Sequence, residues 1–283
     1  MHVPISGKMR RTEPINLTRA PYEVLQYQLN QIAVDHRNDN EPLATVFETM
    51  VSLHFGLSAL LKHQFLIKGT QLPTGKGIVA LSILPVMNNL DNAYRAILKG
   101  MTSTAIPLVR SVFELLTSVM YTLHGNPSDV ELYMKHLTEQ LTPAEEKIVK
   151  KYPYKWFGPA FIQKKLYGND QTKYDKIREV YHLQSGVAHQ IWKSSIELHE
   201  YDPSSITAAL EAIVELMSWS LMIIIWNLEE FLDVDQLSQI ADVVSAALEI
   251  VPETDLYPTN NMFTERITMI EVIQKLKRIK NRT

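Results

Sequence analysis

One stretch of the chain is more apolar than any other, and it limits the folds that can hold it. It reads LMSWSLMIIIWNL over residues 216–228 and is bounded by Glu215 and Glu229. About thirteen residues are fewer than the roughly twenty needed to cross a bilayer. We therefore expect no membrane insertion here, and we interpret the stretch as the centre of a helix buried in a protein core.

Helix signals recur along the rest of the chain. Glycines, prolines and capping residues divide it into segments whose apolar residues repeat at helical spacing. No segment combines alternating apolar residues with hairpin turn chemistry. We therefore predict an all-α fold, a multi-helix bundle of about nine to eleven helices. The expected helices cover residues 42–68, 78–99, 103–124, 129–140, 143–151, 174–192, 203–233, 235–250 and 263–281.

Individual residues predict where several of these helices begin, bend or end. Ser128 and Thr142 are each followed three residues later by glutamate, which is the pattern of a capping box. Asp235 is expected to cap the helix that follows it. Gly100 is expected to end the helix before it, and Pro85 to kink or divide that same helix.

The chain divides into three parts by composition. Residues 1–20 contain basic residues without an apolar stretch behind them, so we expect a flexible leader rather than a signal peptide. Residues 21–251 are expected to form a single helical-bundle domain, with 152–169 as the only candidate for an internal boundary. Residues 252–283 are expected to form a C-terminal amphipathic, basic helix that packs on this domain or extends from it.

Composition excludes several classes of function. The chain has no cysteine, which excludes disulfides and thiolate chemistry and fits a cytoplasmic location. Its net charge of −3 gives no global attraction to nucleic acid. The histidines lack metal-ligand spacing, and the glycine-rich loops of nucleotide-cofactor enzymes are absent. We therefore expect neither a metal nor a cofactor.

A stripe of polar residues lies on the helix expected at 174–192. Arg178, His182, Ser185 and His189 fall at i, i+4, i+7 and i+11, so an α-helix places them on one face. Together they supply a base, a hydroxyl and a fixed positive charge. They are the candidate catalytic residues.

The helix expected at 103–124 carries a second stripe with the same spacing, formed by Arg110, Glu114, Thr117 and Tyr121. If the two stripes face each other, Arg110 and Glu114 could pair with the serine and the second histidine of the first stripe. A carboxylate beside that histidine would raise its pKa toward neutrality. Two other readings stay open for both stripes: a solvated face of an amphipathic helix, and a buried structural network.

Two short motifs carry a resemblance to a known group of proteins. Arg110-x3-Glu114 followed by Tyr181-x3-Ser185-x3-His189 resembles a family of uncharacterised bacterial all-helical proteins, distantly similar to the HEPN (higher eukaryotes and prokaryotes nucleotide-binding) superfamily. The resemblance implies a helical bundle with a HEPN-like core and a link to bacterial or phage conflict. HEPN ribonucleases use an Arg-x4-6-His motif, whereas three residues separate Arg178 from His182 here.

Two functions follow as expectations. The first is a non-enzymatic helical interaction or regulatory protein with a polar Arg/Glu/Ser/His cleft and a protein partner or a second copy as its ligand. The alternative is a metal-independent HEPN-like ribonuclease or nucleotide-binding enzyme, with RNA or a nucleotide as ligand, His189 as the base and Arg178 or Arg110 on the phosphate. In either case Arg110, Glu114, Tyr121 and Tyr181 are the candidate ligand-binding residues.

Overall fold

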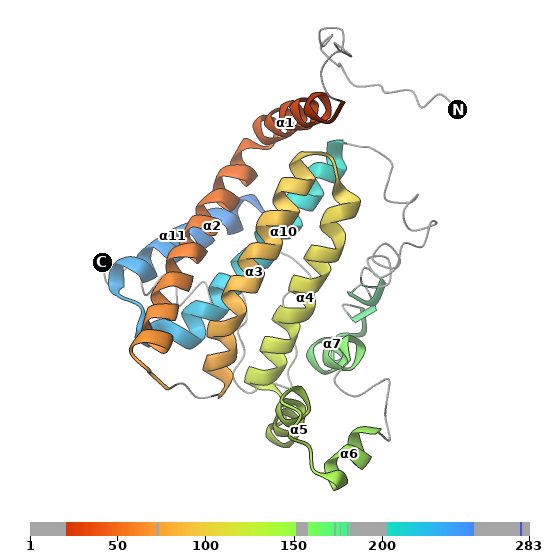
Figure 1. Cartoon of the computed structure of the whole chain (residues 1–283), viewed down its shortest axis with the longest axis vertical. Coiled ribbons are helices and arrows are strands. Elements are labelled where there is room, and N and C mark those ends of the chain that lie inside the picture. Colours follow the sequence, from red (N-terminus) through yellow and green to blue (C-terminus); the bar gives the residue numbers. More distant parts are fainter. Residues whose placement is uncertain are drawn as a thin grey trace.

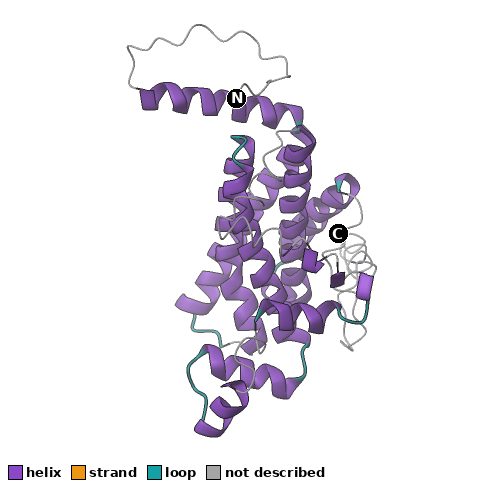
Figure 2. Ribbon diagram, turned by 90° about the vertical axis from the view of Figure 1, so that its right-hand side faces the viewer, coloured by secondary structure: helices purple, strands orange, loops and turns teal. Residues whose placement is uncertain are grey.

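The computed structural model describes residues 21–71, 74–150, 158–172, 174–175, 177–179, 181, 203–251 and 278. Within these ranges the chain forms nine α-helices and no strand, which confirms the predicted all-α bundle (Figure 2). The helices are α1 (Pro21–Asp39), α2 (Glu41–Lys62), α3 (Thr74–Leu98), α4 (Thr102–His124), α5 (Pro127–Leu137), α6 (Pro143–Lys150), α7 (Pro159–Tyr167), α10 (Pro203–Leu228) and α11 (Val234–Ile250). A π-helical turn, η1 (His63–Ile67), follows α2, and a 3-10 turn, η2 (Glu229–Phe231), follows α10.

Helix α10 is the centre of the core. It packs against α2, α3, α4 and α11, and in Figure 1 it runs behind the row formed by α2, α3 and α4. Every residue from Ile213 to Ile225 is buried, including Glu215 and Trp219. A helix enclosed on all sides is expected to be apolar around its whole circumference, which explains the composition of the 216–228 stretch.

Three helices are long and apolar enough to cross a membrane by length and composition alone. They are Glu41–Ile67, Thr102–His124 and Ile206–Phe231. The prediction from 216–228 counted only the most apolar part of a much longer helix and therefore underestimated its length. In the folded protein, 78% of the apolar window of Ile206–Phe231 is buried, against 39% for each of the other two.

Several predicted helix ends are confirmed, and others are shifted. Thr142 and Glu145 form a capping box, with Glu145 Oε2 accepting from the Thr142 N–H at 2.8 Å. Gly100 has φ of 72° and closes α3 as expected of a left-handed C-terminal glycine. Pro85 does not divide α3, which continues through it.

The predicted caps of α5 and α11 are wrong by two residues each. Asn126, not Ser128, caps α5, and its side chain accepts from the Ser128 N–H. Asp233, not Asp235, caps α11 in a capping box with Gln236. In both cases a side chain two residues earlier takes the capping position. Asn, Asp and Ser accept hydrogen bonds from the first free N–H groups of a helix about equally well, so residue type alone does not choose between two such positions.

Two helices lie where the sequence analysis expected none. Helix α7 lies inside the 152–169 segment that was taken as a boundary, and its residues Ile162 and Leu166 join the core. Helix α1 lies across one end of the bundle (Figure 2). Its last turns are attached through His36 Nδ1, 2.8 Å from the Leu98 carbonyl oxygen, and through Arg37.

The predicted leader at 1–20 lies outside the described residues. The predicted C-terminal helix also lies outside them, apart from Arg278, which is helical and exposed.

Candidate functional site

The polar stripe of α4 runs from the surface into the core. Arg110 and Glu114 are partly buried, with 16% and 31% of their side chains exposed. Thr117 and Tyr121, further along the stripe, are buried at 1% exposure each. The hydroxyls of Thr117 and Ser118 both donate to the Glu114 carbonyl oxygen, at 2.9 and 2.8 Å. The solvated-face interpretation is therefore wrong for this stripe.

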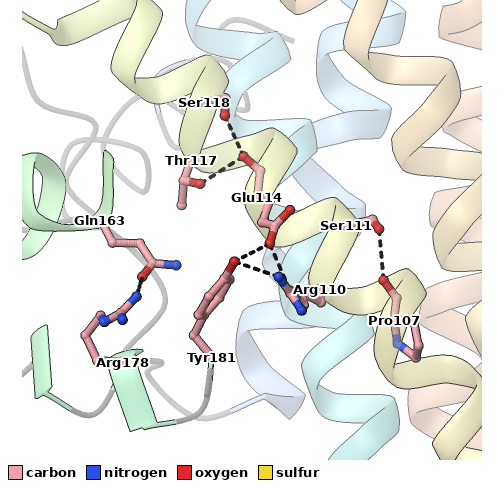
Figure 3. A network of polar contacts seen from close by, with 9 residues as sticks. All are labelled: Pro107, Arg110, Ser111, Glu114, Thr117, Ser118, Gln163, Arg178 and Tyr181. Carbon is pink, nitrogen blue, oxygen red and sulfur yellow. Dashed lines mark hydrogen bonds and ion pairs between the residues drawn. The ribbon is translucent and has the colours of Figure 1, made fainter. Parts of the chain in front are cut away.

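Tyr181 joins Arg110 and Glu114 in a closed cluster, which we call the α4 triad (Figure 3). Arg110 Nε donates to Glu114 Oε1 at 2.9 Å, and Arg110 Nη2 donates to the Tyr181 hydroxyl at 2.7 Å. That hydroxyl in turn donates to Glu114 Oε1 at 2.7 Å. The Arg110 guanidinium also lies over the Tyr181 ring, 4.5 Å from its centroid.

The surroundings shift the pKa values of Tyr181 and Arg110 in the α4 triad. Burial raises the pKa of the Tyr181 hydroxyl, and its hydrogen bond to the Glu114 carboxylate raises that pKa further. Burial alone would lower the pKa of Arg110, but the hydrogen bond and ion pair with Glu114 outweigh it, so the pKa of Arg110 is raised. At neutral pH the triad therefore holds a neutral tyrosine and a charged arginine.

One carboxylate oxygen of the α4 triad is left over. Both hydrogen bonds received by the Glu114 side chain end on Oε1, so Oε2 has no hydrogen-bond donor within the described part of the chain. Arg110 uses two nitrogens in the cluster and keeps further N–H groups, because a guanidinium has five. The triad thus presents an acceptor and donors at a partly exposed position.

Arg178 extends the cluster toward α7. Its guanidinium lies 5.5 Å from the centroid of the Tyr181 ring, and its Nη1 donates to Gln163 Oε1 at 3.3 Å (Figure 3). Gln163 is fully buried, and its Nε2 has no hydrogen-bond partner in the described ranges. If the Gln163 amide were flipped, its NH2 group would face the N–H groups of Arg178, and two donors cannot bond to each other. The Gln163 atom without a partner is therefore the nitrogen, a donor.

Tyr121 belongs to a different environment from the rest of its stripe. Its ring meets the rings of Tyr133 and Phe161 edge-on, at centroid distances of 5.8 and 6.0 Å. Burial raises the pKa of its hydroxyl, which has no hydrogen-bond partner among the described residues. These contacts give Tyr121 a place in the core between α4, α5 and α7, and its role in ligand binding stays a prediction.

The structure brings together part of the predicted site. Arg110, Glu114 and Tyr181 meet, and Arg178 reaches the Tyr181 ring. That the two predicted stripes face each other stays a prediction. His182, Ser185 and His189 lie outside the described residues, so their roles and the pairing of Glu114 with His189 stay predictions. Sequence reasoning did not select Gln163, because a single glutamine in a short helix carries no distinguishing pattern.

A buried carboxyl group lies elsewhere in the same part of the bundle. Glu215 on α10 is 8% exposed, and it was read from the sequence only as the boundary of the apolar stretch. Burial and the nearby Glu215 carboxylate raise the pKa of Tyr167 on α7 well above its usual value. Within the described ranges, no group of three or more His, Asp or Glu side chains could hold a metal ion.

Comparison with known proteins identifies no family for this chain. No protein-family model, curated protein or solved structure matches the chain. The HEPN-like resemblance of the two motifs therefore stays a prediction.

Proposed function

We propose that this chain is a non-enzymatic helical interaction or regulatory protein whose partner binds at the α4 triad. The observation that carries the proposal is the partly exposed Arg110, Glu114 and Tyr181 cluster, closed on itself yet with Glu114 Oε2 left over. Its internal hydrogen bonds fix the side chains before a partner arrives, which reduces the entropy lost on binding.

The residue types of the triad support a binding role. Arginine and tyrosine are enriched among the residues that dominate interface energies, particularly where they are held in a packed setting. Glu114 Oε2 and the remaining N–H groups of Arg110 offer an acceptor beside donors, which is the pattern that a peptide amide complements. A protein segment is thus the ligand class favoured by this site.

The test is partner capture from an extract of the source organism by immobilised full-length protein. Glu114→Gln removes the charge while keeping the shape of the side chain, and Tyr181→Phe removes only the hydroxyl. Glu48→Gln is the matched control, because Glu48 also binds an arginine and a tyrosine, but on α2. We expect a specific partner to be captured by the parent protein and by Glu48→Gln, and to be lost in both triad variants.

Equal capture by the parent protein and both triad variants would place the interface elsewhere. Failure of the parent protein to enrich any partner above a blank resin would count against the interaction function itself. Circular dichroism of each variant shows whether the bundle is intact.

A second candidate function rests on the two guanidinium groups around Tyr181. Arg110 and Arg178 both lie within 5.5 Å of its ring centroid, and two neighbouring arginines are suited to binding a phosphate. The corresponding hypothesis is a metal-independent ribonuclease or nucleotide-binding enzyme with His189 as its base. Cleavage of an RNA pool in the presence of EDTA, lost in His189→Ala, would favour it, whereas equal or absent cleavage by both proteins would reject it.

A further inference from the structure

Acidic residues are unevenly distributed along this chain. It contains 31 of them, yet none lies between Glu48 and Asp91, a stretch that holds Lys62, Lys68 and Lys76. We call residues 49–90 the acid-free hairpin. It comprises most of α2, the turn η1 and the first part of α3, and α2 and α3 stand side by side in Figure 1. This segment therefore carries lysines without acidic residues of its own, although Lys76 is paired with Glu230 of the neighbouring turn η2 (Glu229–Phe231).

Exposed apolar side chains gather on the same hairpin. Leu66 and Ile67, adjacent in η1, are 73% and 72% exposed. Phe55 on α2 and Leu81 and Leu84 on α3 are also exposed. Single exposed apolar residues are ordinary, but neighbouring large aliphatic side chains this far out of the core indicate a binding surface.

The corner that carries Leu66 and Ile67 is fixed to the rest of the bundle. The Phe65 ring packs edge-on against the ring of Phe231 in η2, at a centroid distance of 5.4 Å. Lys76, at the start of α3, forms an ion pair with Glu230 of η2. The two aliphatic side chains are therefore exposed because the turn is anchored by its neighbours, with Phe65 facing inward.

Unpaired cations border this apolar corner. Lys62 and Lys68 flank η1, both are exposed, and neither forms an ion pair with any described residue. An apolar wedge beside lysines fits the boundary between headgroups and acyl chains of an anionic bilayer, where the aliphatic groups are buried and the cations meet phosphates. A protein partner fits less well, because lysine is depleted in the core of protein interfaces.

We propose that the acid-free hairpin binds the surface of an anionic phospholipid membrane. Leu66 and Ile67 insert into the interfacial layer, and Lys62 and Lys68 bind the lipid headgroups. This is contact with one leaflet through an exposed corner, and it does not require any helix to span the bilayer. The surface is independent of the α4 triad.

The test is sedimentation of the full-length protein with vesicles of phosphatidylcholine and with vesicles that also contain phosphatidylserine. We expect binding to the second kind, weakened by added salt. The double variant Leu66→Asp with Ile67→Asp should lower the affinity by about tenfold or more, because two aliphatic side chains no longer leave water. Lys62→Gln with Lys68→Gln should lower it by about tenfold and reduce the salt dependence.

Leu137→Asp is the matched control, since Leu137 on α5 is 55% exposed and lies outside the hairpin. It should bind vesicles like the parent protein. Absence of parent binding to the phosphatidylserine vesicles, or undiminished binding by Leu66→Asp with Ile67→Asp, overturns the proposal. Light scattering without lipid tests whether a second copy of the chain covers this corner instead. A parent dimer that dissociates in Leu66→Asp with Ile67→Asp would assign the corner to that second copy and would also overturn the membrane proposal.

Discussion

Two clusters in this protein use the same three residue types in different ways. The α4 triad joins Arg110, Glu114 and Tyr181, and a second cluster, which we call the α1 clamp, joins Arg37, Glu48 and Tyr94. In the clamp, Arg37 Nε and Nη2 donate to the two oxygens of Glu48 at 2.9 and 2.8 Å, and the Tyr94 hydroxyl donates to Oε1 at 2.7 Å.

The clamp uses both carboxylate oxygens, whereas the α4 triad uses one. Arg37, Glu48 and Tyr94 come from α1, α2 and α3, so the clamp ties three helices together and has the geometry of a bidentate arginine pair. In the triad, Arg110 and Glu114 lie one turn apart on the same helix, and only Tyr181 comes from elsewhere. The clamp therefore ties the fold together through both oxygens, whereas the triad leaves Glu114 Oε2 without a donor among the described residues, which is the feature that the proposed partner binding uses.

The largest expected difference between the two clusters concerns their tyrosine rings. Tyr94 is 6% exposed and its ring lies 4.7 Å from that of Phe47, whereas Tyr181 is only partly buried. Tyr94→Ala should therefore cost about 3–5 kcal/mol of unfolding free energy, and Tyr181→Ala about 1–2 kcal/mol. Urea denaturation of both variants measures this. Equal costs would show that the triad is as much a part of the fold as the clamp.

Acidification should destabilise the fold through a buried histidine. His54 on α2 is fully buried, with Nε2 3.1 Å from the Ser220 hydroxyl of α10, and burial lowers its pKa from 6.5 to about 4. The unfolded chain therefore binds a proton that the folded protein excludes, so stability falls as the pH drops from 6.5 toward 4. The loss should reach about 3 kcal/mol.

His54→Gln removes this titration while keeping a group that can bind Ser220. Urea denaturation across the same pH window should show a flatter profile of unfolding free energy in the variant than in the parent protein. A parent profile as flat as that of the variant would contradict the lowered pKa.

Removing only the hydroxyl groups of Tyr94 and Tyr181 should produce smaller losses of unfolding free energy that still differ between the two clusters. Tyr94→Phe removes the hydroxyl of a tyrosine that is 6% exposed, while its acceptor Glu48, 41% exposed, keeps both hydrogen bonds from Arg37, so the change should cost about 1 kcal/mol. Tyr181→Phe should cost about 0.5 kcal/mol, because water can replace the hydroxyl at a partly exposed site. Thermal and urea unfolding measure both, and a larger cost for Tyr181→Phe would reverse the assignment of the two clusters.

The smallest effect is expected from an ion pair that has no tyrosine. Arg95 Nε donates to Asp91 Oδ2 at 2.9 Å with the same one-turn spacing as the α4 triad, and 69% of the Arg95 side chain is exposed. Arg95→Ala should cost less than about 0.5 kcal/mol. Arg110→Ala measured alongside should exceed this value, and equality of the two would mean that Tyr181 adds nothing to the pair.

The fold was predictable from particular features of the sequence. Gly100 and the Thr142 capping box mark helix ends through local backbone chemistry, and the 216–228 stretch marks the central helix through its composition. The errors at Ser128 and Asp235 arose where a second residue with capping chemistry lies two positions earlier in the chain. Helix α7 was missed because its short apolar pattern lies among aromatic and turn-forming residues.

From the sequence, the site residues were predictable only as two separate sets, one on each of two helices. The Arg-x3-Glu and Tyr-x3-Ser motifs select Arg110, Glu114 and Tyr181, but they give no reason why the tyrosine hydroxyl should bridge the arginine and the glutamate. Gln163 has no pattern at all, and the resemblance of the α1 clamp to the α4 triad appears only when Arg37, Glu48 and Tyr94 meet in space.

The sequence by itself determined that this protein is an all-helical bundle with a buried central helix, because helix periodicity, capping and hydrophobicity act over a few neighbouring residues. Tertiary structure alone decided which polar side chains meet. Tyr181 reaches Glu114 across 67 positions and His54 reaches Ser220 across 166. Such contacts depend on how whole helices pack, and that packing is set by the summed burial of many apolar side chains rather than by the polar residues it brings together.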